Sequence, residues 1–107
     1  MLEYSHMTRL SKEQSAKYSE ELVNTISKHS SDKVFLKEFL KDLLTPKEYK
    51  DIGIRWQIIK RLVKHGKHRQ IARDLKIGTA TVARGSRELG DKSGGFWQMV
   101  KKLGKNL

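Results

Sequence analysis

The chain of 107 residues is long enough for one domain, and its formal charge of +11, from 23 lysines and arginines against 12 acidic residues, favours a polyanionic partner. Nucleic acid is the first candidate and an anionic membrane surface is the second. The absence of cysteine excludes disulfides and thiolate metal sites, and no run of about eighteen apolar residues exists that could span a bilayer.

The first part of the chain is expected to form two helices after a short arm. Residues 1–10 carry no usable pattern and lack the apolar segment of a secretory signal, so we expect a disordered arm there and one domain over 11–107. Ser11 and Gln14 stand three apart and have the spacing of a capping box. Residues 34–44 carry apolar side chains on more than one face, which predicts packing partners on two sides. Because only 36% of the chain is hydrophobic, we expect part of its apolar surface to be buried in an oligomer.

The segment Thr45-Pro46-Lys47-Glu48 is the sharpest helix start in the sequence. Thr45 is expected to cap, Pro46 to take the first helical position, and Glu48 to close a capping box. The helix that follows should turn one broad apolar stripe toward the core, made of Ile52, Trp56, Ile59, Leu62 and Val63. Gly66 predicts its C-terminal stop.

Residues 68–89 have the spacing of a helix-turn-helix. Ile71 and Leu75 stand four apart on one face of a first helix, with Ala72 where two helices cross closely. Gly78 is expected to take a backbone conformation in the turn that would strain other residues, and Thr79 to cap a second helix. The first turn position, where a glycine often sits, is Lys76, so some backbone strain is expected there. That second helix is expected to bury Val82 and Leu89. An ordinary helical hairpin is the alternative interpretation of this pattern.

The exposed side of the second helix carries small side chains, which let a helix enter a major groove and bring methyl groups to thymine. After it, residues 90–95 predict a flexible link, and Phe96 begins a final short helix. No catalytic constellation or phosphate loop is present, so no enzyme activity is expected. His65 and His68 could share a metal, but no third ligand has a matching spacing, so no metal site is predicted.

Residues 42–89 resemble the bacterial tryptophan repressor family. The resemblance depends on three stretches, Leu43-Leu44-Thr45-Pro46-Lys47-Glu48, Ile52-Gly53-Ile54-Arg55 and Gly78-Thr79-Ala80-Thr81-Val82-Ala83-Arg84-Gly85-Ser86. It implies an all-α fold, a small multi-helix domain with a helix-turn-helix that forms an intertwined homodimer. It also implies a bacterial cytoplasmic repressor that binds a palindromic operator in double-stranded DNA. L-tryptophan would be its corepressor ligand and tryptophan biosynthesis genes its targets, with no other cofactor.

The resemblance also implies a tryptophan site. Arg55 and Arg84 match the two arginines that flank the indole ring, and Gly85 matches the residue against which the ring lies. Thr45, with the backbone carbonyl of Leu44, matches the site that receives the amino group. Glu88 replaces a serine that family members usually have near that amino group, and its carboxylate would either pair with the ammonium or crowd the site. The full predicted ligand set is Leu44, Thr45, Arg55, Ile59, Arg84, Gly85 and Glu88.

The predicted DNA-binding residues come from the same stretch. Family positions near DNA are matched by Arg69, Thr79, Ala80, Thr81 and Ala83. Lys76 and Arg73 are added as basic candidates for phosphate contact, and His68 and Gly78 complete the set. The alternative function is a ligand-independent architectural protein that coats DNA with the same helix-turn-helix. A coating protein would not need Thr45, Arg55, Arg84 and Gly85 together.

Overall fold

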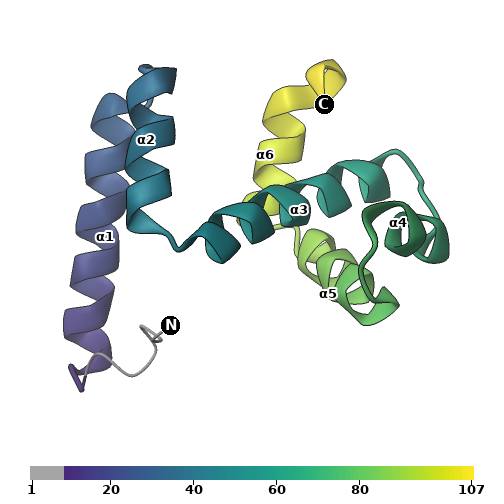
Figure 1. The fold of residues 1–107 in the computed structure, drawn as a ribbon, viewed down its shortest axis with the longest axis horizontal. Helices are drawn as coiled ribbons and strands as arrows, with labels where there is room; N and C mark the ends of the chain where they lie inside the picture. The colour runs from purple at the N-terminus through teal and green to yellow at the C-terminus, as the bar shows by residue number, and fades with distance from the viewer. Residues whose placement is uncertain (1–8) are drawn as a thin grey trace. The chain divides into compact units, whose positions relative to one another are not determined.

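The structure, a computed structural model, describes residues 9–107, so most of the expected arm at 1–10 lies outside the described residues. The described part of the chain is helical and has no strand, which confirms the all-α fold class (Figure 1). Two compact units meet in the sequence between Leu43 and Leu44. The first contains the helices α1 (Lys12–His29) and α2 (Lys33–Leu43). The second contains α3 (Pro46–Val63), α4 (His68–Leu75), α5 (Thr79–Gly90), α6 (Gly95–Leu103) and the short 3-10 helix η2 (Gly104–Asn106).

The first unit is an antiparallel pair of helices (Figure 1). The hydroxyl oxygen of Ser11 accepts a hydrogen bond from the backbone N–H of Gln14, which is one of the two bonds of the predicted capping box, and α1 begins at the expected residue. Neither helix has a buried residue. Large apolar side chains remain exposed on both helices, among them Tyr18, Val23, Val34 and Phe35. The pair by itself therefore has no hydrophobic core.

The second unit begins at the predicted capping box. The Thr45 hydroxyl accepts from the backbone N–H of Glu48, and the Glu48 carboxylate accepts from the N–H of Thr45 at 2.8 Å. At the other end of α3 the left-handed residue is His65 (φ 64°), not the glycine that follows it. Gly66 donates its N–H to the carbonyl of Arg61, and a Cβ on Gly66 would lie only 2.8 Å from that oxygen. Gly66 is thus required by close packing rather than by backbone conformation.

The core lies where α3 crosses α4 and α5. Its buried cluster joins Ile58 of α3 to Ile71, Ala72 and Val82, all less than a tenth exposed. The sequence predicts that Ile71, Ala72 and Val82 are buried, but it does not predict the burial of Ile58. The predicted stripe was correct for the buried Ile59, whereas its first member, Ile52, is 39% exposed. Side chains that pack against the cluster are Ile54, Leu62, Leu75 and Ile77. The α3 face toward the helix-turn-helix is therefore offset from the predicted one.

The link between α5 and α6 is shorter than residues 90–95, because α5 continues through Gly90 and α6 starts at Gly95. Its four residues are held by hydrogen bonds. The Asp91 carboxylate accepts from the hydroxyl and the backbone N–H of Ser93, and these bonds lower the pKa of Asp91 below its ordinary value of 3.8. In addition, the Gln98 amide donates to the Ser93 carbonyl. The start of α6 is thereby fixed to the end of α5.

Candidate ligand cavity and DNA-reading helices

The predicted helix-turn-helix is present as α4 and α5, and its turn has the strain expected at Lys76 but not the conformation expected at Gly78. Lys76 takes the left-handed conformation (φ 57°, ψ 47°), and the N–H of Ile77 closes the turn on the carbonyl of Ala72 at 3.0 Å. Gly78 has an ordinary extended backbone, and a Cβ on it would meet nothing within 4 Å. The prediction that Gly78 takes an unusual conformation is therefore wrong. Gly78 is also the N-cap of α5, so Thr79 is its first helical residue and not its cap.

The predicted DNA-binding residues lie on the open side of this motif. Val82 is fully buried and fixes α5 against the core, which leaves the first turns of α5 outward. All members of the set are exposed except Ala83, which is half-buried: His68, Arg69, Arg73, Lys76, Gly78, Thr79, Ala80 and Thr81. Three of them, Arg69, Arg73 and Lys76, are basic, and His68 carries a positive charge when it is protonated. The whole set lies on α4, the turn or α5. The surface is thus accessible and positively charged, as a DNA-reading surface requires.

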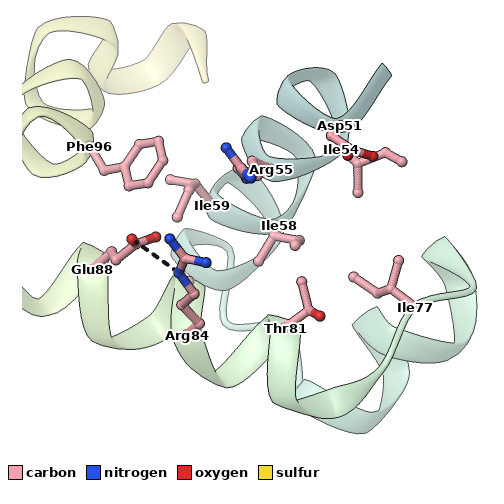
Figure 2. Close-up of a pocket in the computed structure, with 11 residues that line it drawn as sticks. Asp51, Ile54, Arg55, Ile58, Ile59, Ile77, Thr81, Arg84, Glu88 and Phe96 are labelled. Atoms are coloured by element: carbon pink, nitrogen blue, oxygen red, sulfur yellow. Dashed lines mark ion pairs between the residues drawn. The ribbon is translucent and has the colours of Figure 1, made fainter. Parts of the chain in front are cut away.

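A cavity of about 350 Å³ lies between α3 and α5 (Figure 2). The turn of the helix-turn-helix contributes Ile77 to its wall, and α6 contributes Phe96. The remaining lining residues are Asp51, Ile54, Arg55, Ile58 and Ile59 of α3 and Thr81, Arg84, Gly85 and Glu88 of α5. Isoleucine side chains thus form an apolar floor, and charged groups stand around it. Such an apolar concave site with a few charged groups is typical of small-ligand pockets.

Gly85 is buried within α5 because α3 passes directly against it. A Cβ on Gly85 would lie 2.9 Å from Cγ2 of Ile58 and 3.8 Å from Cδ1 of Ile59. The interior glycine thus permits the close crossing of α3 and α5, and it forms part of the cavity wall as well.

Four charged side chains line the cavity, two of each sign. Arg84 and Glu88 form an ion pair on α5, with Nε and Oε2 3.4 Å apart and both side chains largely exposed (Figure 2). On α3, the Asp51 carboxylate accepts a hydrogen bond of 2.7 Å from the ammonium of Lys47. This bond is the main cause that lowers the pKa of Asp51, and the charge of Arg55 adds to it. Both carboxylates therefore stand near cations.

The structure brings together five of the seven predicted ligand residues, namely Arg55, Ile59, Arg84, Gly85 and Glu88. Leu44 and Thr45 are half-buried at the start of the second unit and do not line the cavity. Their role in ligand binding stays a prediction.

Several lining residues were missed from the sequence. Asp51 stands four residues before Arg55, and Ile54 stands four residues before Ile58, so each pair lies one helical turn apart on the same side of α3. Helical periodicity next to Arg55 could therefore have indicated all three. Thr81 was predicted only as a DNA contact, yet it lines the cavity as well. Phe96 gives no local signal, because its place depends on how α6 folds back.

Within residues 9–107, no group of three or more His, Cys, Asp or Glu side chains is placed to hold a metal ion. Over the same residues, every helix is too short or too polar to cross a membrane.

The chain was compared with models of known protein families, with curated proteins and with solved structures. The family model described as Trp repressor protein matches residues 17–104, which is most of the chain. Searches of the curated proteins and of the solved structures gave no match.

Proposed function

The chain belongs to the Trp repressor family, and on this premise we propose that it represses transcription in response to L-tryptophan. The family is one of DNA-binding transcriptional regulators and not of enzymes. The finer proposal is that two copies bind a palindromic operator when tryptophan is bound, and that the operator controls tryptophan biosynthesis genes.

The observation that carries the proposal is the cavity between α3 and α5. Its volume of about 350 Å³ lies at the small end of the range of roughly 300–1,000 Å³ for ligand pockets, which suits a ligand of single amino-acid size. The apolar floor suits an indole ring. Arg55 and Arg84 supply planar guanidinium groups, which can stack on an aromatic face and also reach a carboxylate.

The cavity and the DNA-reading surface share α5, which gives the ligand a way to act on DNA binding. Thr81 belongs to the cavity lining and also to the predicted DNA set in the first turns of α5. We propose that tryptophan wedges between α3 and α5 and favours one orientation of α5. In the homodimer this would set the two reading helices one turn of DNA apart, about 34 Å. Ligand and operator binding would then be coupled reciprocally.

The homodimer is supported by α1 and α2, the helices of the first unit, on which large apolar side chains are exposed and no residue is buried. The positions of Leu44 and Thr45 also support the homodimer. Since they lie outside the cavity of their own chain, their predicted contact with the ligand requires a second copy.

Operator binding with and without tryptophan tests the proposal. An operator is selected from random duplex DNA by the protein in saturating L-tryptophan, and its affinity is then measured by fluorescence anisotropy. We expect two chains per operator and a gain in affinity on adding tryptophan. An affinity that does not respond to tryptophan would refute the sensor and favour the ligand-independent architectural protein.

Arg55→Lys tests the role of the cavity in the same assay. Lysine keeps the charge but loses the plane and the two-pronged donor geometry of the guanidinium. Tryptophan affinity, measured by calorimetry, should fall about tenfold, the lower end for a charge-assisted contact because Arg55 is exposed. Binding to random DNA without tryptophan should not change. Arg87→Lys is the matched control, since Arg87 is an exposed arginine of α5 that does not line the cavity.

A further inference from the structure

The charged groups of the cavity point to the chemical class of ligand it accepts. We propose that Glu88 makes the cavity selective for ligands with a cationic α-amino group. A zwitterionic aromatic amino acid would then be accepted, and the des-amino carboxylic acid of the same shape rejected. The inference rests on the proposed function, because it concerns the same cavity.

The first argument is the charge balance of the lining. Arg55 and Arg84 contribute two positive charges, and Asp51 and Glu88 contribute two negative ones. A zwitterion adds no net charge and can place each of its ends beside an opposite charge. A des-amino acid brings a carboxylate alone, so three carboxylates surround the two guanidinium groups of the lining, and only Asp51 has a further cation, Lys47, outside it. Like charges brought together at a partly desolvated site repel each other.

The second argument is that the two carboxylates differ in how firmly they are held. Asp51 has a short hydrogen bond of 2.7 Å to Lys47, a residue outside the lining. Glu88 has only the 3.4 Å ion pair with Arg84, which is itself a candidate for the ligand's carboxylate. Asp51 keeps its partner when a ligand binds, whereas Glu88 must share Arg84 with the ligand. Glu88 is therefore the carboxylate available to an ammonium group.

The third argument concerns what happens when a ligand carboxylate reaches Arg84. An exposed pair within one helix contributes little to stability, so displacing Glu88 from Arg84 costs little. Two carboxylates would then face the same guanidinium and repel each other. An ammonium on the ligand relieves this repulsion by pairing with Glu88, and a ligand without one cannot. The selectivity thus comes from repulsion of the wrong ligand as well as attraction of the right one.

Calorimetry with L-tryptophan and with indole-3-propionate, which lacks the amino group, tests the inference. The wild-type protein should bind L-tryptophan at least about tenfold more tightly, as expected for a charge-assisted contact. In Glu88→Gln the preference should fall by a similar factor, because indole-3-propionate binds more tightly and L-tryptophan more weakly. Glu38→Gln is the matched control. It removes a carboxylate from another exposed ion pair within one helix, that with Lys41, far in sequence from the cavity lining.

Equal wild-type affinity for the two ligands would overturn the inference, and this comparison needs no variant to fold. An unchanged preference in Glu88→Gln and in Glu88→Ser, both checked for helicity by circular dichroism, would overturn it too. In either case the proposed function stands as long as L-tryptophan binds and raises operator affinity. Failure of the wild-type protein to bind L-tryptophan would instead refute the proposed function.

Discussion

Replacement of Gly85 by alanine should destabilise the protein, although alanine favours helices. The added Cβ would lie 2.9 Å from Cγ2 of Ile58, which is attached to the β-carbon of a buried side chain and cannot swing away. Overpacking of a core costs roughly 1–3 kcal/mol, and the contact here calls for the upper part of that range. Alanine regains about 1 kcal/mol through its helix propensity. The free energy of unfolding should therefore fall by about 1–2 kcal/mol, which lowers the melting temperature by several degrees.

Urea denaturation followed by circular dichroism measures this, at one protein concentration for all variants because a dimer's stability depends on concentration. Gly90→Ala is the control in the same helix, since its Cβ would meet nothing within 4 Å, and it should be neutral or slightly stabilising. Ile58→Leu removes the Cγ2 methyl from the β-carbon and nearly conserves volume, so the double variant with Gly85→Ala should recover part of the loss. Full stability of Gly85→Ala, or no recovery in the double variant, would refute the close crossing of α3 and α5.

Two further predictions concern the turn and the link. Lys76→Gly should raise the free energy of unfolding by about 0.5–1 kcal/mol, because glycine adopts the left-handed conformation at φ 57° without strain; an unchanged or lower melting temperature would contradict this. Asp91 has a folded-state pKa below 3.8, so its carboxylate stabilises the fold above that pH and the contribution is lost as the pH falls through the folded-state value. The free energies of unfolding of the wild-type protein and of Asp91→Asn are compared by denaturation at neutral and at acid pH. The wild-type protein should be more stable at neutral pH, and the difference should shrink at acid pH. A difference that stays constant would count against the hydrogen bonds to Ser93.

Local features of the fold could be predicted because each depends on neighbouring residues only. The caps at Ser11 and Thr45 follow from a hydroxyl three residues before a glutamine or glutamate. The spacing of Ile71, Ala72 and Val82 was sufficient to place the buried face of the helix-turn-helix. These patterns do not require knowledge of what packs against them.

The errors arise where a choice depends on tertiary packing. Isoleucines at 52, 54, 58 and 59 allow more than one apolar stripe on α3, so the sequence alone does not decide which stripe faces the core. Ile58 is buried because α5 packs against that side of α3. Strain at Lys76 was expected from its place in the turn, but Gly66 and Gly78 were given special backbone roles that the structure does not assign to them, and the left-handed residue after α3 is His65. In the cavity, Phe96 is placed by the hydrogen-bonded link at Asp91, which no periodicity reveals.

The position of the core in the sequence bears on how the chain folds while it is synthesised. Among the described residues, every fully buried apolar side chain lies between Ile58 and Val82, in α3, α4 and α5. The α1 and α2 helices leave the ribosome before these three helices but contain no buried residue. The contacts within the core span short distances along the chain, which favours rapid folding of that part. The large apolar side chains of this helix pair are still exposed when the core has formed, so the pair is the part of the chain most exposed to aggregation.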